Sequence, residues 1–256
     1  MKSIWTGAIG FGLVNIPIKL YSATSKSELD LDMLDKKDHS HIKFHRVNEK
    51  TGKEVPFANI VKGYAIKGDY VILEDKDFER ANPKKSKFIE IINFVKLEEI
   101  DSIYFETPYY AEPQKSGTKA YGLLRHALEK SGKAGLGNFV LRNREHLCIL
   151  KPSGSAIVVN RIRFAEEIRD SADLTLPKNV KPTAAEMKMA MTLVDQLTSK
   201  FNIEKYKDTY SAELLKLVKA KAKGKEFKEE EPVLKVSHRK ADDLMAQLKA
   251  SLKKAS

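Results

Sequence analysis

Apolar residues along the first two thirds of the chain alternate with polar ones or are interrupted by glycine, a pattern typical of β-strands. The opening stretch carries Gly7, Gly10 and Gly12 and then the alternating letters IPIKLY of residues 16–21. Glycines so placed interrupt a helix but suit strands that bend or pack closely. Residues 88–97 are rich in β-branched and aromatic side chains, which predicts another strand. We expect mostly β structure up to about residue 180.

A further strand is predicted over residues 156–164, and its sequence indicates which side is buried. Every second residue of a strand points to the same face. One face carries Val158, Ile162 and Phe164, and the other carries Val159, Arg161 and Arg163. We interpret the first face as the core side and the second as a partly basic outer side.

Helical periodicity interrupts the β pattern once and dominates after Pro182. Apolar residues three and four apart predict a helix from about residue 120 to Gly132. Thr183 and Glu186 match a capping box before a second amphipathic helix, and a third is predicted over 208–222. The apolar face of the second helix and the residues after it carry Met187, Met191, Val194 and Phe201. Beyond a charged linker, a last helix is predicted with the stripe Leu244, Leu248 and Leu252.

Charge is segregated along the sequence. The chain has 46 basic and 35 acidic residues, a net charge of +11. Basic residues outnumber acidic ones by eight to three in residues 36–67 and by five to one in 138–163, whereas 97–112 hold five acidic and no basic residues. This distribution predicts one basic surface, suited to a polyanion, and a separate acidic surface.

Several classes of protein are disfavoured by composition. The single cysteine, Cys148, permits no internal disulfide and no four-cysteine metal site, and its apolar neighbours predict burial. No apolar run approaches the roughly 20 residues of a membrane helix. There is no phosphate-binding glycine loop, and we expect no cofactor. The glycine-interrupted N-terminus does not match an export signal, so we expect a cytoplasmic protein.

A histidine cluster offers an alternative chemistry. His39, His41 and His45 lie at even spacing beside Asp38, so on an extended strand the three imidazoles would face one side. Such a set could bind a metal, which leaves a metal-dependent nuclease or phosphoesterase as the alternative function. The surrounding lysines repel a cation, so we favour histidines that face solvent near a polyanion.

Five segments in order resemble the prokaryotic Ku family, whose members are homodimers that encircle broken DNA ends. They are IWTGAIGFGLVNIPIKLYSAT at 4–24, VKGY at 61–64, FETPYYAEP at 105–113, REHLCIL at 144–150 and DLMAQLKASL at 243–252. The resemblance implies a mainly β fold with α, in which an antiparallel Ku-like β-barrel core carries a strand-built arch and is followed by a C-terminal helical arm. It implies barrel and arch in residues 1–180, a dimerisation arm in 181–224, and a linker with a partner-docking helix in 225–256.

The resemblance also implies where DNA binds. The arch corresponds to residues 41–68, and the expected phosphate contacts there are Lys43, Arg46, Lys50, Lys53 and Lys62. Arg142 and Arg144, at a hairpin tip, complete the expected DNA-binding set. Lysine and arginine contacts to phosphate carry no sequence information, which suits a protein that accepts any broken end. No catalytic or metal-binding residue is implied.

The implied function is a non-enzymatic homodimer that binds double-stranded DNA ends, holds them, and recruits the ATP-dependent DNA ligase D in non-homologous end joining. A closed ring would load only where a duplex terminates, and many phosphate contacts would make loading sensitive to salt. A sequence-blind architectural DNA coat that needs no end is a third hypothesis, because the same basic surface would serve it.

Overall fold

The computed structural model describes residues 1–81, 87–142, 144–177, 181–224 and 248. Two compact units make up the chain, one formed by residues 1–26 and 32–170 and the other by 27–31 and 171–256. The predicted linker and last helix, apart from Leu248, lie outside the described residues. Within the described part, every helix is too short or too polar for a bilayer crossing.

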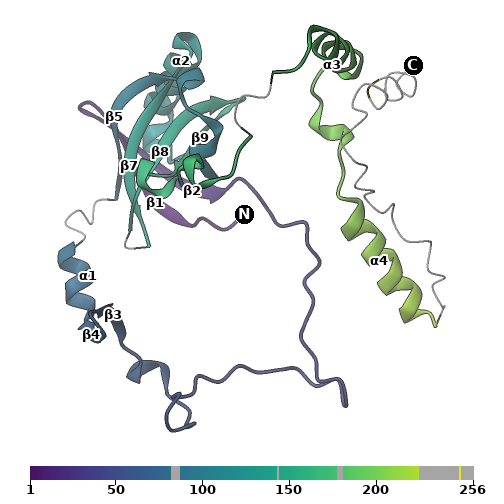
Figure 1. Cartoon of the computed structure of the whole chain (residues 1–256). Helices are drawn as coiled ribbons and strands as arrows, with labels where there is room; N and C mark the ends of the chain where they lie inside the picture. Colours follow the sequence, from purple (N-terminus) through teal and green to yellow (C-terminus); the bar gives the residue numbers. More distant parts are fainter. Residues whose placement is uncertain (82–86, 143, 178–180, 225–247, 249–256) are drawn as a thin grey trace. The chain divides into compact units, whose positions relative to one another are not determined.

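Seven strands of the first unit close into a barrel in the order β1-β2-β6-β9-β8-β7-β5 (Figure 1). Their bounds are β1 Trp5–Phe11, β2 Val14–Ser22, β5 Phe88–Lys96, β6 Phe105–Pro113, β7 Lys133–Leu141, β8 Arg144–Ser153 and β9 Ala156–Ile162. Neighbouring strands are antiparallel, except that β1 and β5 close the barrel in parallel. The expected mainly β fold with α, built on a closed barrel of mostly antiparallel strands, is confirmed.

Glycine at the barrel closure lets β1 and β5 approach closely. A Cβ atom at Gly7 would lie 2.2 Å from the backbone oxygen of Lys87, closer than real contacts allow. The next amide, that of Ala8, donates to this same oxygen at 2.8 Å. The glycines of the opening segment therefore belong to a strand, as the sequence predicts, and Gly7 makes room for the closing hydrogen bond.

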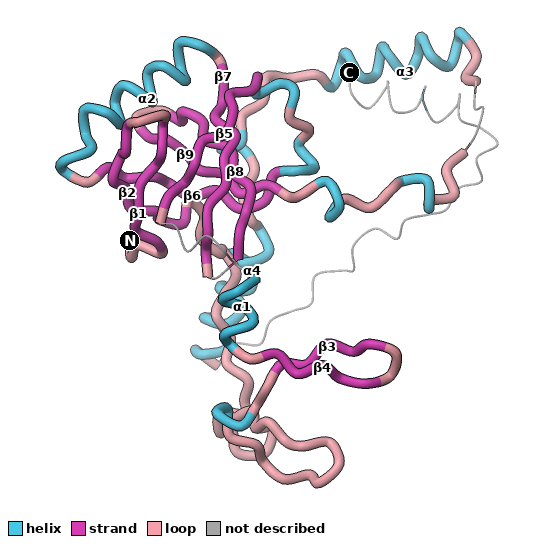
Figure 2. Tube along the Cα trace, turned by 90° about the vertical axis from the view of Figure 1, so that its left-hand side faces the viewer, coloured by secondary structure: helices cyan, strands magenta, loops and turns pink. Residues whose placement is uncertain are grey.

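Helix α2 (Thr118–Ser131) covers one end of the barrel (Figure 2). Its buried residues Tyr121, Leu124 and Leu128 join the core formed by the inward rows of the strands. The helix ends at Gly132, which adopts the left-handed conformation (φ +65°) expected of a C-terminal cap. The predicted helix over 120–132 is thus confirmed. Helix α2 covers the apolar interior of the barrel at one end of its strands.

The outer face of β7, β8 and β9 is also buried. Ala134, Ile149 and Ile162 form a second apolar cluster with partly buried residues that include Ile100 and Tyr104. Consequently β9 buries both faces, and the barrel interior receives Ile157 and Val159 rather than Val158 and Ile162. The predicted core side of this strand was wrong, because alternation cannot say which of two apolar faces lies inside a closed barrel.

The chain leaves the barrel after β2 and returns at β5. Because α2 links the end of β6 to the start of β7, and these strands run antiparallel to β2 and β5, this excursion begins and ends opposite α2. Residues 32–81, which we name the arch segment, contain the hairpin of β3 (Lys62–Ile66) and β4 (Asp69–Leu73) followed by α1 (Asp75–Ala81) (Figure 2).

The second unit contains α3 (Ala184–Leu197) and α4 (Thr209–Ala222). The predicted capping box is present: the Thr183 amide donates to Glu186 Oε2 at 2.6 Å, and the Glu186 amide donates to Thr183 Oγ1 at 3.3 Å. Asp208 caps α4 and also accepts a hydrogen bond from Ser27 Oγ at 3.2 Å. Neither helix has a fully buried residue, so most of their apolar side chains face outward.

Candidate nucleic-acid interface

The inward rows of two strands change from apolar to basic at the barrel end opposite α2. On β8, Leu150 and Cys148 lie in the core, and the next two inward positions are His146 and Arg144. On β9, Val159 is followed on the same face by Arg161, which pairs in register with Cys148. The barrel interior therefore ends in cationic side chains at the end from which the arch segment departs.

These side chains line a hollow of about 390 Å³, which we name the basic hollow. Its lining consists of Ile4, Ser22, Thr107, Tyr109, Leu141, Arg142, Arg144, His146 and Arg161. Arg142 sits in the β7–β8 turn with a positive φ of 51°, beside Arg144 at the start of β8. The structure thus brings the two predicted arginines together, and their common environment suits an anion.

Arg161 is held in the basic hollow by one carboxylate. Its Nε donates to Glu106 Oε2 at 2.7 Å, and its Nη2 donates to Glu106 Oε1, which makes the pair bidentate. Both side chains are partly shielded, at 23% and 31% exposure. The hydrogen bond from Arg161 holds the pKa of Glu106 below its usual value, so the carboxylate is charged at neutral pH.

His146 faces the same hollow in its neutral form. Partial burial lowers its pKa, and the positive charge of Arg161 lowers it further, while Glu106 opposes this effect. Because the usual value of 6.5 is already below neutrality, the imidazole carries no proton charge at pH 7. The ring lies against Phe139, with 6.0 Å between the ring centroids.

The five predicted cations of the arch segment lie outside the lining of the basic hollow. Arg46 lies 5.3 Å from the ring centre of Phe57, and Lys62 lies 4.8 Å from that of Phe78, so aromatic rings position both charges. Lys50 and Lys53 flank a turn built on Asn48, whose side chain accepts the Lys50 amide at 3.0 Å. Lys43 is likewise exposed. The turn presents its lysines to solvent.

The three histidines do not face one another as an extended strand would require. His39 adopts a positive φ of 58° in a turn, His41 bridges to Leu34, and His45 Nδ1 lies 2.9 Å from Glu54. Within the described residues, no three histidine, cysteine or acidic side chains are grouped to hold a metal ion. The geometry therefore gives the nuclease or phosphoesterase alternative no support.

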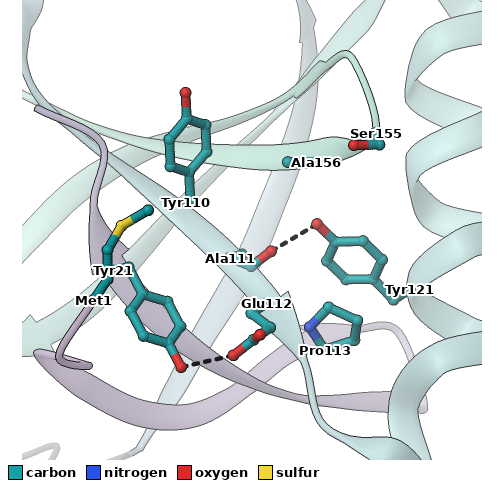
Figure 3. A pocket seen from close by; sticks show the side chains of 9 residues that line it. All are labelled: Met1, Tyr21, Tyr110, Ala111, Glu112, Pro113, Tyr121, Ser155 and Ala156. Carbon is teal, nitrogen blue, oxygen red and sulfur yellow. Dashed lines mark hydrogen bonds between the residues drawn. The ribbon is translucent and has the colours of Figure 1, made fainter.

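A second hollow, on the outer face of β2 and β6, has the opposite chemistry (Figure 3). Tyr21 donates to Glu112 Oε2 at 2.6 Å, and this bond raises the pKa of the tyrosine. Tyr121 forms its wall, donating to the oxygen of Ala111 at 2.7 Å. A carboxylate among tyrosines does not attract phosphate. The predicted acidic segment does not form a surface apart from the basic residues, because Lys19 pairs in register with Glu112 and Glu106 binds Arg161 in the basic hollow.

Comparison with known proteins identifies the family. The family model described as the Ku70/Ku80 beta-barrel domain matches residues 10–189. The chain belongs to the Ku family. It is 40% identical over 227 residues to the non-homologous end joining protein Ku of Coxiella burnetii, a match that covers 87% of this chain and 83% of the relative. It is also 43% identical over 229 residues to that of Bacillus subtilis, covering 88% and 74% respectively.

The Ku proteins are DNA-end-binding scaffolds rather than enzymes. Cys148, the strongest nucleophile by residue type, is fully buried, and burial raises its pKa so that it stays a thiol. The functional groups that the barrel exposes at the end where the arch segment departs are therefore charged side chains.

Sequence reasoning missed Arg161 and His146 as members of the basic hollow. Arg161 counted toward the basic segment, but it was assigned to the outer face of its strand. The available signal was the register of the REHLCIL segment: since Cys148 was expected to be buried, His146 and Arg144 share its face. The register of β8 with β9 places Arg161 beside them.

Proposed function

We propose that this chain forms a homodimeric ring that threads onto double-stranded DNA ends, protects and holds them, and recruits the ATP-dependent DNA ligase D in non-homologous end joining. The observation that carries the DNA contact is the set of exposed cations on the arch segment and in the basic hollow, at one end of the barrel. In this proposal residues 1–180 bind DNA, 181–224 form the dimerisation arm and 225–256 dock the ligase.

The chemistry of these cations supports backbone binding. Lysines on the turn around Asn48 act as point charges, whereas arginines in the hollow can bond two phosphate oxygens each. Contacts of this kind are blind to base sequence, so specificity for ends would come from the closed ring. A protein of this design acts on chromosomal DNA and would be found with the nucleoid.

The ring is tested by comparing linear DNA with covalently closed, relaxed circles of the same sequence. We expect binding to the linear form and little to the closed circle. A ring that is threaded first and then trapped by circularising the DNA should resist a salt wash that removes it from linear DNA. Equal affinity for both forms would reject the ring and favour the architectural coat.

The apolar surface of α3 and the segment after it supports dimerisation. Met187, Met191 and Val194 lie on one side of α3 and are exposed, and Phe201 is 80% exposed. Apolar groups of this size are stabilised by burial, and a second copy of the chain would supply the cover.

Light scattering on the free protein tests the arm. The wild type should have the mass of a dimer, and Val194→Glu should reduce it to that of a monomer. Gln196→Glu adds the same charge to the same helix at an exposed polar position and should leave the dimer intact. A wild-type monomer, or two variants with the same mass, would contradict the proposed arm.

The ligase contact is proposed for residues 225–256 from the resemblance of this segment to the C-terminal region of the family. A chain that ends at residue 224 should still bind DNA ends, because the basic hollow and the arch segment are retained. It should no longer stimulate end joining by the ligase. Full stimulation by the shortened chain would remove this part of the proposal.

A further inference from the structure

We propose that the basic hollow is a binding site for a phosphate group, in which the carboxylate of Glu106 occupies part of the place that phosphate takes beside Arg161. The site itself is inferred from the geometry, whereas DNA as the source of the phosphate rests on the function proposed above. The inference assigns Arg161 and His146, neither of which belongs to the expected DNA-binding set, to the ligand.

Charge balance favours an anion in this hollow. Arg142, Arg144 and Arg161 contribute three positive charges, and Glu106 cancels one of them. His146 is neutral there. A hollow of about 390 Å³ is large enough for a phosphate with its ester group, and the hydroxyl groups of Thr107 and Tyr109 on its wall are available as further donors.

The Arg161–Glu106 pair shows the geometry that a phosphate would meet. The guanidinium already presents Nε and Nη2 together to two carboxylate oxygens. Phosphate accepts the same fork of parallel donors. Because Glu106 is partly exposed, it can release Arg161 without leaving a charge buried and unpaired.

His146 reports on the occupant of the hollow. The charged groups that face it are Arg144 on its own strand, Arg161 on β9 and Glu106 on β6. A bound anion stabilises the protonated imidazole, so phosphate should raise the pKa of His146. By linkage, phosphate should bind more tightly as the pH falls through this pKa.

The first experiment follows the histidine ring signals of the free full-length protein by NMR over a pH titration. Sodium phosphate is compared with sodium chloride at equal ionic strength. We expect phosphate to raise the midpoint of His146, while the ring signals of His126 on α2 serve as the internal control. Identical midpoints of His146 in the two salts would overturn the phosphate site.

Three variants then test which residues bind the phosphate. Arg161→Gln and Arg144→Gln should each weaken phosphate binding by roughly tenfold, because each removes a charged donor. Lys119→Gln, which removes an exposed charge from α2 at the other end of the barrel, should have no effect. If Lys119→Gln weakens binding as much as the two arginine variants, the effect is one of net charge and the site is rejected.

Phosphate binding by the Glu106→Gln variant tests whether Arg161 binds the ligand or only supports the barrel. Removing the competing carboxylate charge should strengthen phosphate binding several-fold if Arg161 contacts the phosphate. Weaker phosphate binding in Glu106→Gln would show that the Arg161–Glu106 pair only supports the barrel. It would overturn the proposal that phosphate replaces the Glu106 carboxylate beside Arg161. The unchanged His126 signal confirms that each variant is folded.

DNA duplexes distinguish the sources of the phosphate. Linear duplexes that carry 5′-phosphate or 5′-hydroxyl ends are added to the same sample. A shift of His146 with both duplexes assigns a backbone phosphate, and a shift with the phosphorylated duplex alone assigns a terminal one. A shift with inorganic phosphate but with neither duplex assigns a free phosphate; the site then stands while its link to end binding fails.

Discussion

At the scale of single residues, one buried hydroxyl connects α2 to two strands of the barrel. Tyr121 Oη donates to the oxygen of Ala111 at 2.7 Å and accepts from the amide of Ile157 at 2.6 Å. Tyr121→Phe would leave both backbone groups short of a partner in a buried place. We expect a loss of about 1–3 kcal/mol in the free energy of unfolding, measured as a lower urea midpoint of the barrel.

Tyr110→Phe is the matched control for this substitution. Tyr110 lies on the outer face of the same β6 strand and is 39% exposed, so its hydroxyl can bond to water. Its loss should change the urea midpoint little. Equal effects of the two substitutions would show that the buried hydrogen bonds of Tyr121 do not stabilise the barrel.

The Glu106 carboxylate gives the barrel a pH dependence of known sign. Arg161 lowers the pKa of Glu106 in the folded state from 4.5, so the stabilisation is complete above that value and disappears as the pH falls through the lowered pKa. Glu106→Gln should therefore be less stable than the wild type at pH 7. Thermal unfolding should show this difference shrinking in acid, and a difference that stays constant down to pH 3 would contradict the assignment.

At the scale of elements, β1 shows two glycines with different roles. A Cβ at Gly7 would meet the backbone oxygen of Lys87 at 2.2 Å, whereas the nearest atom to a Cβ at Gly10 lies at 3.8 Å. Gly7→Ala should therefore force β1 and β5 apart and cost about 1–3 kcal/mol in the free energy of unfolding. Gly10→Ala should cost little. Chemical denaturation of both variants checks this, and equal stabilities would contradict the close approach.

Local elements could be predicted from the sequence because their signals are local. The capping box at Thr183 and the C-terminal glycine of α2 act within one helical turn, and both were predicted correctly. The inner face of β9 could not be predicted, because a second apolar cluster covers its outer side. That face depends on which distant segments pack on the strand.

The candidate site also has one part that could be predicted from local sequence and one part that depends on how strands pair. The exposed cations of the arch segment follow from charge and family position, and whether they touch DNA stays a prediction. The basic hollow depends on the register between two neighbouring strands: Arg161 lies beside Arg144 and His146 because β8 and β9 pair with Cys148 opposite Arg161. Register of this kind is a tertiary property, and single-strand alternation does not contain it.

At the scale of the whole molecule, the net charge of +11 does not by itself explain DNA binding. General positive charge attracts any polyanion, while bound phosphates release counterions only where cations touch them. DNA binding through the overall charge of the protein and DNA binding through contacts with particular cations therefore differ in which lysines matter. Lys43, Lys50 and Lys53 lie on the arch segment, whereas lysines of equal charge lie beside α2 at the opposite end of the barrel.

Salt dependence measures this difference directly. Each lysine that contacts a phosphate should contribute about 0.9 to the slope of log K against log salt concentration. Replacing Lys43, Lys50 and Lys53 with glutamine should lower the slope accordingly on linear duplex DNA. The matched control replaces Lys115, Lys119 and Lys133, which are exposed at the α2 end, and changes net charge by the same amount. The control should keep the wild-type slope. If both triple variants lower it equally, the arch segment does not contact DNA and only the overall charge of the protein matters.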